Sequence, residues 1–168
     1  MFPYHVFYSL LAVSCLYALL RGGAPERWGA IIYAVSALLT TAAVSPWHSR
    51  YLSIELGVLV VDLAMLAVLV LLALRAERFW PLWVSAFQII GTAAHAIKAW
   101  DPALLRLGYA FAMSLWSYPM LLLLVAGTWC HRRRLKREGA DPSWSSSCGR
   151  SAARPARAPT ASSANSAA

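Results

Sequence analysis

The stretch that most constrains this chain is Ile54–Leu74, a run of 21 residues in which nearly every side chain is apolar. As a helix it would be roughly 31 Å long, at about 1.5 Å per residue, which matches the hydrocarbon core of a bilayer. Two acids interrupt the run, Glu55 near its start and Asp62 about two turns further in. Because a carboxylate at that depth in lipid is costly, Asp62 is expected to face a protein interior or a wet cavity.

Four more apolar segments accompany this stretch, and turn-forming or charged residues separate them. Only 13% of the residues are charged, whereas soluble proteins carry about 25%. The sequence therefore predicts an all-α polytopic membrane protein, a bundle of five transmembrane helices within residues 1–138. Pro119 falls in the middle of the last segment, where a proline is expected to kink a helix. The predicted segments are about 2–20, 28–44, 54–74, 79–98 and 104–129.

The distribution of Lys and Arg predicts the orientation of these segments, because cytoplasmic flanks of membrane helices are enriched in both. One side holds nine basic residues near the segment ends, and the other side holds three, Arg50, Lys98 and Arg106. We therefore expect the N-terminus outside and the C-terminus in the cytoplasm, for a protein of the inner (cytoplasmic) membrane. The nine are Arg21, Arg27, Arg75, Arg78, Arg132, Arg133, Arg134, Lys136 and Arg137.

The remaining residues, 139–168, are rich in Ser, Ala, Pro and Arg, which predicts a disordered cytoplasmic tail. The formal charge of +8 is explained by membrane flanks, so nucleic acid is not an expected partner. Membrane lipids are the expected partners, and a second copy or another membrane protein is left open. The three cysteines, Cys15, Cys130 and Cys148, show no pattern of a disulfide framework or thiolate metal site.

Polar residues recur at the middle depth of the predicted helices. Ser85, Gln88, Thr92 and His95 are spaced by three and four, so they share one helix face. Gln88 and Thr92 are expected near the depth of Asp62. Such groups often only hydrogen-bond between membrane helices, but intramembrane acids are also candidates for ligand or proton sites. The candidate ligand-binding residues are Asp62, Gln88, Thr92, His95 and Tyr118.

A second group is expected at the outer ends of the helices. His5, Glu55 and His95 offer imidazole and carboxylate groups that suit zinc or iron, and the two histidines could be opposed axial ligands of a haem. The other interpretation is that these are ordinary interfacial residues. No cofactor is predicted, and haem or zinc is left open as an alternative.

Segments four and five resemble a group of small bacterial multi-pass membrane proteins of unknown function. The residues that carry this resemblance are Arg78-Phe79-Trp80-Pro81-Leu82-Trp83, Phe87-Gln88, His95, Asp101-Pro102, Trp116 and Tyr118-Pro119. The chain is also faintly similar to the membrane domain of the emopamil-binding sterol isomerases and the sigma-2 receptor. That resemblance implies an acid on one helix, here Glu55 or Asp62, and a histidine on the next, here His95.

No catalytic motif is present, so no catalytic residue is predicted and a non-enzymatic role is favoured. The first hypothesis is an integral membrane scaffold or accessory protein. The alternative is a pocket for a small apolar ligand, with acid/base chemistry by Asp62, Glu55 and His95. The second alternative is metal or haem binding at the outer face.

Overall fold

The described residues of this protein form an all-α bundle of five helices. The structure is a computed structural model that describes residues 4–44, 55–76, 78–100, 108, 115–139, 141 and 144. The helices are α1 (Tyr4–Arg21), α2 (Ala24–Ala43), α3 (Leu56–Arg75), α4 (Trp80–Trp100) and α6 (Ser117–Glu138).

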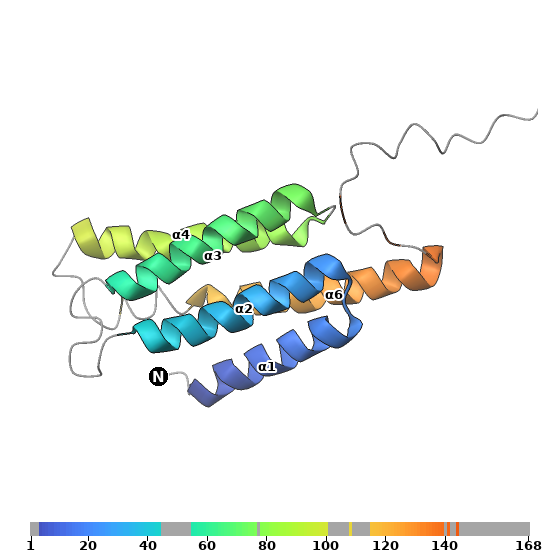
Figure 1. The fold of residues 1–168 in the computed structure, drawn as a ribbon, viewed down its shortest axis with the longest axis horizontal. Coiled ribbons are helices and arrows are strands. Elements are labelled where there is room, and N and C mark those ends of the chain that lie inside the picture. Colours follow the sequence, from blue (N-terminus) through green and yellow to red (C-terminus); the bar gives the residue numbers. More distant parts are fainter. Residues whose placement is uncertain are drawn as a thin grey trace, which may run out of the picture.

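The helices run alternately up and down and close into a ring (Figure 1). Each of α1 to α4 packs against the next one in the chain, while α6 packs against α4 and α1 and also contacts α2. One end of the bundle therefore carries the α1–α2 turn, the α3–α4 connection and the C-terminus of α6. We call it the basic end, because all nine Lys and Arg residues of the predicted cytoplasmic flanks lie there, whereas Lys98 lies at the opposite end.

Local sequence explains the helix boundaries at the basic end. Gly22 and Gly23 separate α1 from α2, and Pro25 stands in the first turn of α2, where its missing N–H costs no hydrogen bond. Pro81 takes the same position in α4. At the end of α6, Gly139 adopts φ 72° and its N–H bonds the carbonyl of Leu135, so a left-handed cap closes the helix.

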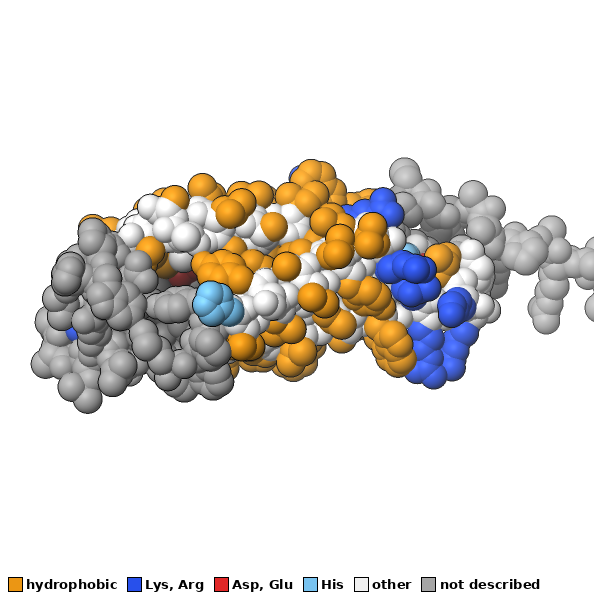
Figure 2. Space-filling view, turned by 90° about the horizontal axis from the view of Figure 1, so that it is seen from below, with side chains coloured by type: hydrophobic (Ala, Val, Ile, Leu, Met, Phe, Trp, Pro, Cys, Tyr) orange, Lys and Arg blue, Asp and Glu red, His pale blue; other side chains and the backbone are white. Residues whose placement is uncertain are grey.

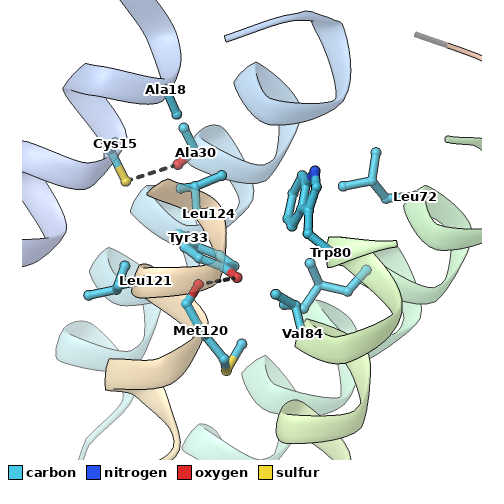
Figure 3. Close-up of a cluster of buried hydrophobic side chains, with 11 residues drawn as sticks. Cys15, Ala18, Ala30, Tyr33, Leu72, Trp80, Val84, Met120, Leu121 and Leu124 are labelled. Carbon is cyan, nitrogen blue, oxygen red and sulfur yellow. Dashed lines mark hydrogen bonds between the residues drawn. The ribbon is translucent and has the colours of Figure 1, made fainter. Parts of the chain in front are cut away.

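All five helices contribute to one buried apolar core (Figure 3). Two hydrogen bonds tie it together across helices: Tyr33 Oη donates to the Met120 carbonyl at 3.2 Å, and Cys15 Sγ donates to the Ala30 carbonyl at 3.5 Å. The core side chains are Cys15, Ala18, Ala30, Tyr33, Leu69, Leu72, Trp80, Val84, Met120, Leu121 and Leu124.

Trp80 fills the space where α2, α4 and α6 meet near the basic end. A Cβ atom added at Gly29 or at Gly127 would lie 2.6 Å from the Trp80 ring. The two glycines therefore let α2 and α6 approach the indole from different sides. The indole fills the space that side chains at positions 29 and 127 would otherwise occupy.

The outer surface of the bundle is unusually apolar. Large hydrophobic side chains are exposed on all five described helices, from Val13 on α1 to Leu122 on α6. In Figure 2 hydrophobic side chains cover the middle of the molecule, while Lys and Arg gather at one end. Within the described residues, α3 alone is long and apolar enough to cross a membrane, by length and composition, and α1 is a shorter apolar helix.

The low burial of α3 argues against a soluble core helix, because only 17% of its apolar window is buried inside the bundle. A core helix of a soluble protein would be mostly buried. Its most exposed apolar side chains include Leu74 at 71% and Leu56 at 66%. This helix presents hydrocarbon outward, which water disfavours.

The last helix differs most from its predicted segment. Pro119 stands in the first turn of α6, which begins at Ser117, and the expected kink stays a prediction because residues 109–114 lie outside the described residues. The basic cluster, expected to follow the helix, is part of α6, which runs to Glu138. The predicted residues 104–107 and 109–114 lie outside the described residues, as does most of the predicted tail.

Candidate functional site

Two groups of polar side chains lie inside the bundle. The first, which we call the Asp62 cluster, joins Asp62 of α3 to Gln88 and His95 of α4. The Gln88 amide nitrogen donates to Asp62 Oδ1 and to the Asp62 carbonyl, both at 3.3 Å. His95 Nε2 lies 3.3 Å from Asp62 Oδ2. The sequence placed these three residues at neighbouring depths, and the structure brings them into contact.

The members of the Asp62 cluster differ in their exposure. The side chain of His95 is 1% exposed, whereas that of Asp62 is 21% exposed. A carboxylate beside an imidazole can accept, hold and return a proton. An approaching molecule would reach Asp62 first, with His95 behind it.

The two remaining ligand-binding candidates make other contacts. Thr92 donates its hydroxyl to the Gln88 carbonyl of its own helix at 2.8 Å. The Tyr118 ring packs edge-on against Phe7 of α1, with ring centroids 5.7 Å apart. Ser85, on the same face as Gln88, likewise bonds its own helix through the Pro81 carbonyl. Thr92 and Ser85 thus bond within α4, and Tyr118 packs between α6 and α1.

The candidate metal ligands are spread out. His5 is exposed on α1, where it borders a shallow surface hollow, and Glu55 is buried at the start of α3. His95 belongs to the Asp62 cluster. Among the described residues, no group of three or more His, Cys, Asp or Glu side chains is placed to hold a metal ion. Metal or haem binding through His5, Glu55 and His95 stays a prediction.

The second group, which we call the basic-end network, lies under the α1–α2 turn. Its members are Glu26, Arg78, Trp80, His131 and Asp141. Glu26 is fully buried, and its Oε1 accepts a hydrogen bond from Trp80 Nε1 at 3.1 Å. The same oxygen lies 3.4 Å from Arg78 Nε, an ion pair outside hydrogen-bond geometry. The carboxylate thus joins the start of α2 to the start of α4.

Asp141 completes this network from beyond the end of α6. Its Oδ1 accepts a hydrogen bond from Arg78 Nη1 at 2.7 Å. Its Oδ2 lies 2.6 Å from His131 Nδ1, so this nitrogen carries the proton and donates it to the carboxylate. Arg134 Nε adds a further contact at 3.2 Å to Oδ1 and 3.3 Å to Oδ2.

The charges around Asp141 favour its ionised form. Burial by itself raises the pKa of the Asp141 carboxyl. The hydrogen bonds from Arg78 and His131, with the positive charges of Arg78 and Arg134, outweigh that effect and hold the pKa below its usual range. Asp141 is therefore a buried anion in a basic pocket.

Sequence reasoning missed the basic-end network. The sequence indicates Arg78 only as a basic residue of a cytoplasmic flank, and it puts Asp141 in the predicted disordered tail. Instead, Asp141 contacts the bundle, and Trp144 forms an isolated antiparallel bridge with Ala76. One signal was available: Glu26 is an acid among the arginines of the predicted cytoplasmic side, where a buried partner explains it better than solvent.

Comparisons with known proteins leave the site to be judged by its geometry. No protein-family model, no curated protein and no solved structure matches this chain.

Proposed function

We propose that this protein is a multi-pass membrane protein whose five helical segments cross the inner membrane, with the basic end in the cytoplasm, and that it serves as a scaffold or accessory protein. The observation that carries this proposal is the outward-facing hydrocarbon of the helices, above all α3, of which only 17% is buried. Each described helix has 18 to 22 residues, or roughly 27 to 33 Å at 1.5 Å per residue. By itself α3 has the length and composition for a bilayer core, whereas the basic cluster occupies the last two turns of α6.

The distribution of polar and apolar side chains supports the same membrane proposal. The buried side chains include Glu26, Gln88 and His95, while apolar side chains cover the outside. In lipid this inverted arrangement satisfies polar groups internally and leaves hydrocarbon against hydrocarbon. At the basic end, Arg133 stacks over the exposed Trp129 ring at 5.2 Å. An aromatic ring beside a cation is typical of the membrane–water interface.

The scaffold role follows from what the bundle offers to partners. The apolar belt fits lipid tails or a flat apolar surface of another membrane protein, and the basic end fits anionic headgroups. Partners are therefore expected along the sides of the helices.

Thiol labelling tests the membrane proposal at the two ends of α1. Five crossings place His5 outside and Arg21 inside, so an impermeant maleimide should label a cysteine at position 5, and not one at position 21, in intact cells. If both cysteines react equally, α1 does not cross the membrane and the five-crossing proposal is wrong.

A second candidate function rests on the Asp62 cluster. We propose that Asp62 and His95 form the polar end of a site for a small apolar ligand, with proton exchange between carboxylate and imidazole. The 3.3 Å contact between them and the partial exposure of Asp62 favour this function. Glu55 is the second acid in this hypothesis. It is buried at the start of α3 and makes an interaction of its own.

Mass spectrometry of molecules that co-purify with the protein tests this candidate. The Asp62→Asn variant keeps the side-chain shape and replaces the carboxyl group by an amide, so an apolar ligand should be recovered at least fivefold less well. Ser85→Ala is the matched control, because Ser85 is buried on α4, the helix of Gln88 and His95, and its hydroxyl donates to the Pro81 carbonyl of that helix. Equal recovery from wild type, Asp62→Asn and Ser85→Ala would rule out an Asp62 ligand site.

A further inference from the structure

Three side chains at the basic end of the bundle, those of Arg78, His131 and Arg134, form the pocket around the Asp141 carboxylate. Arg78 precedes α4 and pairs with Glu26, while His131 and Arg134 project from consecutive turns of α6. The Arg78 side chain is only 3% exposed. Trp80, two residues after Arg78, packs between Gly29 and Gly127 at the same end of the bundle.

The carboxylate that fills the pocket comes from outside the helices. Asp141 follows Gly139, whose left-handed conformation ends α6 and turns the chain. Bundle residues thus form the receptor, and a residue beyond the last helix supplies the anion. This arrangement has the form of a binding site occupied by a ligand from the same chain.

The charges of the pocket indicate what kind of ligand would compete with Asp141 for it. Arg78 and Arg134 bring two positive charges, and Glu26 and Asp141 bring two negative ones. Without Asp141 the pocket would be left with excess positive charge and with donors on three different side chains. A phosphate group has the charge and the several acceptor oxygens to engage them together, and arginine suits phosphate geometry.

A surface groove lies near the pocket and shares Gly23 with the surroundings of His131. Gly23 borders His131 so closely that a Cβ added there would lie 2.9 Å from His131 Cε1. Gly23 also lines an open groove of about 330 Å³ together with Arg27, Trp28 and Ile31. The groove combines a cation, an interfacial indole and an apolar wall.

We propose that Arg78, His131 and Arg134 form a phosphate-binding site at the basic end, and that Asp141 is its built-in competitor. The phosphate belongs either to an anionic lipid headgroup or to a free phosphate compound. Displacement of Asp141 would release the chain beyond α6 from the bundle. The free-phosphate case stands without the membrane proposal, whereas the lipid case rests on it.

Thermal unfolding of the full chain in detergent tests the site with inorganic phosphate. The Asp141→Ala variant should bind phosphate at least tenfold more tightly than wild type, seen as a larger rise in Tm at a given concentration. Chloride at equal ionic strength controls for screening. Glu138→Ala is the matched variant, because it removes an exposed acid from the same end of the bundle. Equal responses of Glu138→Ala and Asp141→Ala would overturn the proposal.

A second arm distinguishes the two sources of phosphate. The variants are reconstituted in vesicles of phosphatidylcholine, with or without phosphatidylglycerol. A Tm rise of Asp141→Ala with phosphatidylglycerol alone identifies the lipid headgroup, and a rise with inorganic phosphate identifies a free compound. If neither raises its Tm more than that of Glu138→Ala, the pocket is only a structural ion pair and the proposal fails.

A second variant is used if Asp141→Ala does not fold. Asp141→Asn, which retains the side-chain shape, then replaces it. If neither variant folds in chloride, purification in phosphate or with phosphatidylglycerol should restore folded protein. Failure of both to restore it would also overturn the proposal.

Discussion

Asp141 is the residue at which the contacts of the basic end converge. Arg78, His131 and Arg134 surround its carboxylate, and its side chain is only 4% exposed. A buried ion pair need not add net stability, because both charges lose hydration. Removal of one partner is destabilising, because the other charge then stays buried without a counter-charge. The Asp141 contacts should therefore be visible in stability measurements.

We predict that Asp141 makes folding stability depend on pH in the acidic range. The folded-state pKa of Asp141 lies below its unfolded value of about 4. Its contribution is therefore fully present above that unfolded value and is lost as pH falls through the lower, folded one. Unfolding curves between pH 6 and pH 3 should show this loss in wild type and a flatter profile in Asp141→Asn. Parallel profiles would show that the carboxylate is not stabilised by its neighbours.

At the scale of elements, the close approach of α2, α4 and α6 depends on the Trp80 ring and its two glycines. Glycine at positions 29 and 127 makes each helix less stable than alanine would. The absence of a side chain at these two positions lets α2 and α6 contact the indole, which also donates a hydrogen bond to Glu26. Trp80 thus belongs both to the core and to the basic-end network.

We predict that Gly127→Ala destabilises the bundle by about 1–3 kcal/mol, because the new Cβ would lie 2.6 Å from Trp80 and the ring must shift. Gly91→Ala is the control. There the nearest atoms would be 3.9 Å away, so the substitution should be neutral or stabilise by up to about 1 kcal/mol. Chemical unfolding in detergent measures both changes. Similar effects at the two glycines would refute the role given to Trp80.

Among the described residues, the approximate positions of the first four helices could be predicted from sequence, because apolar blocks and turn residues alternate along the chain. The Asp62–His95 contact was also within reach, since helical spacing places both on polar faces of neighbouring segments. The basic-end network was not. Glu26, Arg78, His131 and Asp141 are far apart in sequence, and charges at helix ends usually face water. Only the closure of the ring by α6 brings them together.

At the scale of the whole molecule, the bundle has an apolar exterior, buried polar clusters and one basic end. These three features fit a protein that crosses the membrane with each helical segment. A single crossing by α3 would instead leave the exposed apolar side chains of the other helices in water. The number of crossings is therefore the central claim, and the two arrangements make different predictions for α1 and for α4 with α6.

The most direct measurement is labelling of single cysteines by an impermeant maleimide in intact and permeabilised cells. The native cysteines are replaced, and reporters are placed at His5, Arg21 and Trp100, with Cys130 retained in the fourth variant; all four positions are exposed in the structure. Five crossings predict labelling at positions 5 and 100 in intact cells, and at 21 and 130 only after permeabilisation. A single crossing by α3 predicts that position 5 behaves like 21 and position 100 like 130, and that result would contradict the account.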